Sequence, residues 1–470
     1  MSVLYQQAAD ILQAVLDRKG GLKSLAYDEK VSNKRSSYAL VCQTMKYKRH
    51  LDVLLENVNC TFEMKKMKPR SLGYIVLYDL LIGRGKITGG GHVKKVWMKH
   101  SVLLKSALVD YLAEKGVKTV SELLPKLLRT ANAFPRYARV NTLQISTEKV
   151  LELFKSSHPE MDISSDVHIP NLLLFPPKTE LHEHELVING SLILQDKASC
   201  FPAYVLRGQE TSVISGDTVD ACAAPGNKTS HLAMLVHSKN SKDVIFAFDR
   251  SVKRLDLLKK RMKEASADRV ESVCQDFLSI DVTSTKYQNV TSILLDPSCS
   301  GSGMSNRLDH VLDFVTEEDE EITVDYCDDR ITQLAEFQFQ ALCKAFTFPN
   351  VKRISYSTCS IFAAENERVV EKALAYAQKE GYSFELRKAL PTWERRGIAD
   401  KGLSEEQREC VLRTDAHEDN TNGFFVALFV HTSEPKPSMI TDAQRERRKR
   451  KRSAQKKNRT NEKKGKVDNE

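Results

Sequence analysis

The segment DACAAPGNKTS, residues 220–230, decides the fold that the sequence predicts. A short strand-like run ends at Asp220, and small residues then lead into a helix predicted from about Ser230. Small residues let the backbone approach a ligand closely, and the free amides at a helix start favour the negative groups of that ligand. The sequence therefore predicts a ligand-binding turn between a strand and a helix.

Two common phosphate-binding patterns do not fit this turn. A Walker A loop needs glycine where Ala221 stands, and it needs Gly and Lys together where Asn227 separates Gly226 from Lys228. A dinucleotide fingerprint fails as well, because the turn has no Gly-x-Gly-x-x-Gly pattern. The nature of the ligand has to be inferred from the strands that follow.

Strand-like and helical segments alternate from Gly216 to Val430, which predicts an α/β domain with a doubly wound, mostly parallel sheet. Ligands of such sheets bind at the carboxyl ends of the strands. Asp249 ends the second strand, where an acid can accept both hydrogens of a ribose diol, and Arg254 follows one helical turn later. Asp276 ends the third strand, where a carboxylate could contact an adenine amino group. One such acid is often only a helix cap, but the series indicates a nucleoside cofactor such as S-adenosylmethionine.

The fourth and fifth strands each deliver a cysteine to this same edge. Cys299 follows the fourth strand, just after Asp296, and Cys359 follows the fifth. A buried structural thiol is the alternative for either cysteine, but Pro, Gly, Ser and Thr flank both rather than apolar residues. The chain has ten cysteines and no Cys-x-x-Cys pattern, so we expect no zinc or other metal site.

Charge is distributed unevenly along the chain. Residues 1–115 are predicted to form a basic α-helical domain, since the first 100 residues contain 18 basic and 8 acidic residues. This one-signed excess favours a nucleic-acid-facing surface over merely solvated helix faces. Residues 116–200 predict a small α/β unit, and residues 201–432 the main domain. An insert at 309–329 has ten acidic residues and no Lys or Arg, which predicts a solvated loop or helix. A calcium site is the alternative, but the oxygens lack the spacing and the glycine of an EF-hand loop.

The C-terminal residues 433–470 are polar and predicted to be disordered. Residues 441–470 contain 13 basic and 5 acidic residues, which indicates a nuclear or nucleolar address and loose contact with RNA. No apolar stretch reaches the ~18 residues of a membrane span, and the first residues lack a secretory signal. We therefore expect an intracellular protein that does not span a membrane.

Seven segments resemble motifs of the NOP2/Sun RNA (cytosine-5) methyltransferases, and the resemblance covers most of residues 1–432. They are PRYARVNTL (135–143), LILQDKASC (192–200), DACAAPGNKTS (220–230), FAFDRSVKR (246–254), LLDPSCSGSGM (294–304), YSTCSIFAAENE (356–367) and NGFFVALF (422–429). The Asp-Pro-Ser-Cys form, with residues 73–91 and 181–199, resembles member five of that family, whose proteins methylate a cytosine in large-subunit ribosomal RNA.

The resemblance implies a Rossmann-like class I methyltransferase domain that binds S-adenosylmethionine. It assigns the nucleophile to Cys359, whose thiolate would add to carbon 6 of cytosine because carbon 5 alone is too weak a nucleophile. Cys299 would help to release the product. The cofactor positions of the family map onto Cys222, Ala223, Ala224, Pro225, Gly226, Asn227 and Lys228 on the methionine and ribose side, Asp249 and Arg254 near the ribose, and Asp276 and Asp296 at the adenine and reactive ends.

The predicted function is cytosine-5 methylation of ribosomal RNA, naked or in a pre-ribosomal particle, by a monomer in the nucleus or nucleolus. The small α/β unit and the basic helices are expected to bind RNA, with Arg136 and Arg139 guiding its backbone. Two alternatives stay open. One is a non-catalytic RNA-binding ribosome assembly factor. The other is a DNA cytosine methyltransferase, which would draw its nucleophile from a fourth-strand Pro-Cys, whereas Ser298 precedes Cys299 here.

Overall fold

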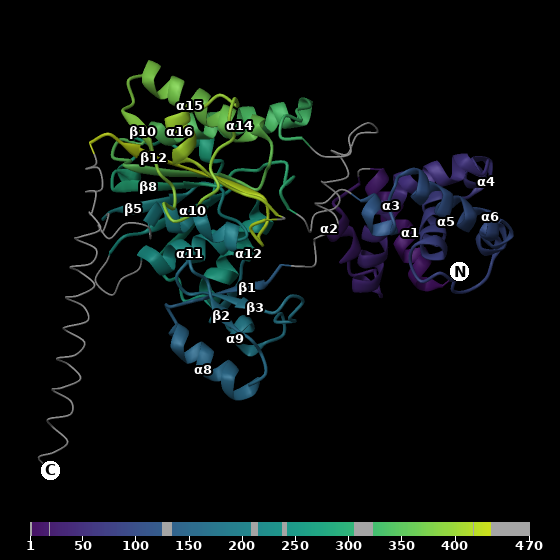
Figure 1. The fold of residues 1–470 in the computed structure, drawn as a ribbon. Coiled ribbons are helices and arrows are strands. Elements are labelled where there is room, and N and C mark those ends of the chain that lie inside the picture. Colours follow the sequence, from purple (N-terminus) through teal and green to yellow (C-terminus); the bar gives the residue numbers. More distant parts are fainter. Residues whose placement is uncertain are drawn as a thin grey trace, which may run out of the picture. The chain divides into compact units, whose positions relative to one another are not determined.

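The computed structural model describes residues 2–17, 19–124, 134–207, 215–236, 242–304, 323–416 and 418–433 (Figure 1). Residues 309–322 of the predicted acidic insert, and all but the first residue of the predicted disordered tail, lie outside these ranges. Among the described residues, no helix is both long and apolar enough to cross a membrane.

The N-terminal region is helical, as predicted, with its own buried core around Trp97 and Leu104. The longest of its described helices, α3, runs without a break over 24 residues, because no Gly or Pro interrupts it. The elements are α1 (Val3–Leu16), α2 (Leu22–Ala26), α3 (Lys34–Asn57), α4 (Thr61–Lys66), α5 (Arg70–Leu81), α6 (His92–Glu114) and η1 (Val120–Leu123).

A small antiparallel sheet follows, in the order β2-β3-β1-β4. Its core is formed by Val150, Phe154 and Phe175 with their apolar neighbours. Its strands are β1 (Arg136–Val140), β2 (Ser164–Ser165), β3 (Leu172–Phe175) and β4 (Leu192–Leu194), with helices α8 (Thr147–Ser157) and α9 (Glu185–Ile188).

Arg139 corrects one prediction about this unit. Its side chain is fully buried and cannot guide an RNA backbone. Its Nε donates to Gln195 Oε1 at 2.9 Å, and its Nη2 donates to Ser230 Oγ at 2.7 Å. Arg139 therefore ties the small sheet to helix α11 (Asn227–Val236) of the next domain. The guanidinium tolerates burial because these contacts satisfy its donors.

The large sheet has the order β10-β12-β9-β8-β5-β6-β7, with β11 paired to β12. Every pair of neighbouring strands within β5 to β9 is parallel. Strand β12 pairs antiparallel with β9, β10 and β11. This confirms the predicted doubly wound, mostly parallel sheet. The strands are β5 (Asp217–Asp220), β6 (Ile245–Asp249), β7 (Val270–Cys274), β8 (Val290–Leu295), β9 (Arg353–Thr358), β10 (Phe384–Arg387), β11 (Leu412–Thr414) and β12 (Phe424–His431).

Helices cover both faces of this sheet, and Figure 1 shows α10, α11 and α12 on one side and α14, α15 and α16 on the other. Successive residues of a strand point to opposite faces of the sheet. Ala247 packs in the core on the side of α10, α11 and α12, and Phe246 packs in the core on the side of α14 and α15. The helices are α10 (Lys197–Arg207), α11 (Asn227–Val236), α12 (Val252–Glu264), α14 (Asp329–Phe346), α15 (Glu367–Lys379) and α16 (Glu405–Cys410), with 3-10 turns η2 (Phe277–Ser279), η3 (Thr285–Tyr287) and η4 (Ala363–Glu365).

Candidate active site

The turn between β5 and α11 is fixed by its neighbours on both sides. The Ala221 amide donates to Leu294 O of β8 at 3.0 Å, and the Ala223 amide donates to Phe248 O of β6 at 2.8 Å. Gly226 has a φ of +106°, and a Cβ there would come within 3.0 Å of Met262 Cε. The turn thus needs a glycine at this point. Helix α11 begins at Asn227, three residues before the predicted start.

Asp220, at the end of β5, is a site residue that the sequence analysis missed. Its side chain is buried; Oδ2 accepts a hydrogen bond from Thr229 Oγ1 at 2.7 Å, while Oδ1 has no hydrogen-bond partner among the described residues. Burial raises the pKa of Asp220 to about 7. Its place at the end of a strand is the signal that could have identified Asp220, because the same place identified Asp249.

The acid at the end of β6 is held by two contacts. Asp249 Oδ1 accepts the Ser251 amide at 2.9 Å, and Oδ2 lies 3.3 Å from Arg254 Nη2. The same Arg254 nitrogen donates to Ala224 O at 2.5 Å, so this residue fastens the turn to the acid. Asp276 lies two residues beyond β7 and caps η2 through the Leu278 amide at 2.9 Å. That contact is the capping role expected of many strand-end acids, and it leaves Oδ2 for a ligand.

The two predicted cysteines lie together. Cys299 Sγ and Cys359 Sγ are 2.9 Å apart, a hydrogen-bond contact rather than a disulfide. The hydrogen bond with Cys359, together with burial, raises the pKa of Cys299 well above its ordinary value. Cys299 is therefore a neutral thiol beside Cys359. Burial also raises the pKa of Cys222, so that cysteine too stays a thiol.

A half-buried ion pair lies at the same edge of the sheet as the two sulfurs. Lys228 Nζ, in the first turn of α11, lies 2.8 Å from Asp296 Oδ2, and Ser357 Oγ donates to Asp296 Oδ1 at 2.6 Å. Burial alone would lower the pKa of Lys228, but Asp296 and Cys359 outweigh burial and raise it. The lysine is thus a cation whose electrostatic interaction reaches Cys359.

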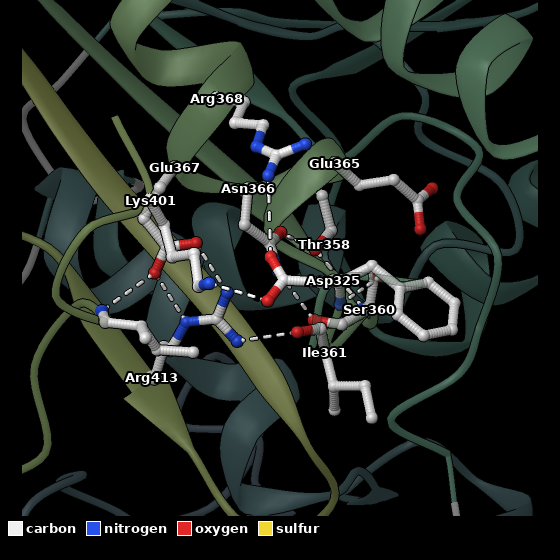
Figure 2. Close-up of polar contacts among 12 residues, drawn as sticks. Asp325, Thr358, Ser360, Ile361, Glu365, Asn366, Glu367, Arg368, Lys401 and Arg413 are labelled. Carbon is white, nitrogen blue, oxygen red and sulfur yellow. Dashed lines mark hydrogen bonds and ion pairs between the residues drawn. The ribbon is translucent and has the colours of Figure 1, made fainter. Parts of the chain in front are cut away.

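The backbone after Cys359 is held rigidly from outside the site (Figure 2). Thr358 Oγ1 donates to Asn366 Oδ1 at 2.5 Å, and Asn366 Nδ2 donates to Ser360 O at 2.9 Å. Arg413 Nη1 donates to Ile361 O at 2.9 Å, while its Nε and Nη2 form a fork on the buried Glu367 carboxylate at 2.6 and 2.5 Å. These contacts fix the position of Cys359 relative to its strand.

The Glu367 side of the network continues outward. Its Oε1 also accepts the Ile398 amide at 3.1 Å. At the exposed end, Asp325 pairs with Lys401 at 2.6 Å and with Arg368 at 3.4 Å, as Figure 2 shows. The loop that carries the cysteine is thus anchored by β11, α15 and the segment before α16.

Comparison with known proteins assigns the chain to a family. Profiles described as the NOL1/NOP2/Sun domain family member 5 N-terminal domain and ferredoxin-like domain match residues 35–124 and 134–195, and a 16S rRNA methyltransferase RsmB/F profile matches residues 203–430. The 28S rRNA (cytosine-C(5))-methyltransferase of Mus musculus is 38% identical over 94% of both chains. This chain belongs to the NOL1/NOP2/Sun domain family.

A further relative and a solved structure are also similar to this NOL1/NOP2/Sun chain. The 25S rRNA (cytosine-C(5))-methyltransferase rcm1 of Schizosaccharomyces pombe is 37% identical over 91% of each chain. A methyltransferase homolog protein from Pyrococcus horikoshii shares the fold, with a TM-score of 0.51 and 23% identity over 69% of this chain and 99% of that one. The match to member five confirms the branch that the sequence resembles.

The residues of this NOL1/NOP2/Sun chain fit S-adenosylmethionine, the cofactor of its methyltransferase family. The φ of +106° at Gly226 favours glycine and keeps the turn narrow. Carboxylates stand at the ends of β5 and β6 and two residues beyond β7, at the same edge of the sheet. The structure places the predicted residues Cys222 to Lys228, Asp249, Arg254, Asp276 and Asp296 along this edge. No group of His, Cys, Asp and Glu able to hold a metal ion occurs among the described residues.

Proposed function

We propose that this enzyme adds a methyl group to carbon 5 of a cytosine in large-subunit ribosomal RNA, with Cys359 as its nucleophile. The observation that carries the proposal is the thiol pair, 2.9 Å apart beside the Lys228–Asp296 ion pair. Relatives named 28S and 25S rRNA (cytosine-C(5))-methyltransferases, aligned over nearly the whole chain, support the choice of RNA.

The first step is addition of the Cys359 thiolate to carbon 6 of the cytosine. A carbon–sulfur bond forms, and the electron pair displaced from the ring makes carbon 5 nucleophilic. An ordinary thiol is only a few per cent ionised at pH 7, so the thiolate needs a stabilising charge. Lys228 provides that charge, because it is a cation within electrostatic reach of Cys359. Asp296, whose charge acts on Cys299, accepts the amino hydrogen of the base.

The residues from Cys222 to Lys228, with Asp249 and Asp276, hold the cofactor. When bound, S-adenosylmethionine supplies an electrophilic methyl group. Arg254 acts as a positioning residue, because its hydrogen bond to Ala224 and its ion pair with Asp249 fix the turn against the second strand.

The last step releases the product. Cys299 acts in this step, as the base that removes the proton from carbon 5. Its pKa is raised first of all by the hydrogen bond with Cys359. Once Cys359 is bonded to carbon 6, that cause disappears and the pKa of Cys299 falls, while burial, Glu365 and Asp296 still hold it above its ordinary value. In the proposed step Cys299 acts as the base. Its sulfur then takes the proton from carbon 5, while the electrons of the breaking carbon–sulfur bond return to Cys359 as a thiolate.

Localisation and organisation follow from the same proposal. An enzyme that acts on large-subunit ribosomal RNA works in the nucleus or nucleolus, and its substrate is naked RNA or a pre-ribosomal particle. The basic residues 441–470 are the proposed targeting signal. We assign residues 1–115 to a basic helical domain, 116–200 to an RNA-binding unit and 201–432 to the methyltransferase domain, acting as a monomer.

The test is methyl transfer from labelled S-adenosylmethionine to large-subunit ribosomal RNA. The wild-type protein should label cytosine at carbon 5, and Cys359→Ala should abolish labelling while cofactor binding persists. Labelling that survives Cys359→Ala would contradict the mechanism. Cofactor binding without transfer to any ribosomal RNA or particle would instead favour an RNA-binding assembly factor.

A further inference from the structure

A cavity of about 410 Å³ lies where the small sheet meets the methyltransferase domain. Val187 and Ile188 of α9 form its apolar wall, and Asn227, Arg261 and Glu264 of α11 and α12 form its polar wall. Its volume is in the range of sites that hold small organic groups. Of the described residues that line it, none is a cysteine or a strand-end acid, so it is separate from the sulfur pair.

The polar wall presents both donors and an acceptor. Arg261 makes its hydrogen bonds from Nη1, to Asn227 Oδ1 at 2.9 Å and to Pro225 O at 3.3 Å. These bonds hold the guanidinium against the turn and leave Nε and Nη2 for a ligand. The half-buried Glu264 carboxylate, 3.8 Å from Lys260, offers acceptors on the same helix. A group with both hydrogen-bond donors and acceptors along one edge matches this wall.

The apolar wall is open to solvent. Ile188 is 64% exposed at the end of α9, although it is a large apolar side chain. Val187, which also lines the cavity, is half-buried, so these two side chains form an accessible apolar part of the lining. A flat ring with polar edges, such as a nucleobase, suits a cavity with one apolar and one polar side.

The surroundings of the cavity are basic. Helix α12 has six basic residues against two acidic ones, a net charge of +4. Lys259, Lys260 and Lys263, in its last two turns, are exposed. A surface of this sign attracts a phosphate backbone. Asn227 of the cavity directly precedes Lys228 of the catalytic site, so the two regions lie within the length of a few nucleotides.

We propose that this cavity binds a nucleobase of single-stranded RNA adjacent to the target cytosine, with the neighbouring phosphates on α12. The inference rests on the proposed function, because it concerns the RNA substrate of that site. It also gives the small sheet a different RNA contact from the predicted one, since Arg139 is buried and Ile188 is exposed.

The test compares two aspartate variants in binding to a short single-stranded RNA that contains one cytosine. Ile188→Asp puts a negative charge at the mouth of the cavity, whereas the control Val167→Asp puts one at an 87% exposed position that does not line it. Ile188→Asp should weaken RNA binding about 10-fold relative to the control, as measured by fluorescence anisotropy. Calorimetric binding of S-adenosylmethionine should stay at the wild-type level in both variants.

A second RNA separates base binding from simple charge repulsion. When the nucleotides that flank the cytosine are abasic, wild-type protein should lose a comparable factor, and Ile188→Asp should cause little further loss. Equal RNA binding by the two variants, or an undiminished Ile188→Asp effect on abasic RNA, would overturn the inference. A loss confined to RNase-treated pre-ribosomal particles would assign the cavity to a protein and also overturn it. These readouts need no methyl transfer, so a failure of the proposed function would be seen separately.

Discussion

The buried ion pair behind the Cys359 loop permits a quantitative prediction. Glu367 is fully buried, and its partner Arg413 donates two hydrogen bonds to it and a third to Ile361 O. Glu367→Ala would leave the guanidinium buried without a counter-charge, which typically costs about 3–5 kcal/mol. At roughly 2–4 °C per kcal/mol for a domain of this size, the melting temperature should fall by about 6–20 °C.

Thermal unfolding followed by circular dichroism measures this effect. Glu152→Ala is the matched control, because it removes the acid of the exposed Lys149–Glu152 pair, 3.0 Å long, which is worth about 1 kcal/mol or less. The double variant Glu367→Leu with Arg413→Met should be more stable than Glu367→Ala, since it leaves no buried charge unpaired. A melting temperature for Glu367→Ala within 3 °C of the control would refute this account of the loop.

Two further predictions concern charged groups of the site. Asp220 has its pKa raised to about 7, against an unfolded value near ~3.9, so its contribution to stability is complete below pH ~4 and is lost as the pH rises through 7. Asp220→Asn should therefore gain stability over wild type between pH 5 and pH 8 in urea unfolding without cofactor; a pH-independent difference would contradict the raised pKa. Lys228→Met should lower the rate of methyl transfer by about 100-fold at pH 7 and shift its pH optimum upward, because the thiolate then forms only near the ordinary thiol pKa. An unchanged pH profile with RNA bound normally would remove Lys228 from the role of thiolate stabiliser.

The strand ends were predictable because alternation of strands and helices fixes which residues meet at one edge. Asp249 ends a buried strand, and Cys299 and Cys359 follow two others. A parallel sheet brings such positions together whatever their separation in sequence. The 2.9 Å contact of the two sulfurs is a consequence of β8 and β9 being neighbours.

Features that depend on tertiary contacts were not predictable. Arg139 looked like an RNA ligand because an arginine in a short strand is usually exposed, and only its contacts with Gln195 and Ser230 show that it is internal. The short strands β10 and β11 have little pattern of their own and are defined by pairing with β12. The fork between Arg413 and Glu367 joins residues 46 positions apart, a distance over which spacing carries no signal.

The central claim is that Cys359, and not Cys299, bonds to the cytosine. The most direct measurement uses Cys299→Ala, which should still form the adduct but fail to release it. After incubation with ribosomal RNA and S-adenosylmethionine, a shifted band should accumulate on a denaturing gel, and mass spectrometry should find the nucleotide on the peptide that contains Cys359. Rapid release of fully methylated RNA by Cys299→Ala, or an adduct on any other residue, would contradict the account.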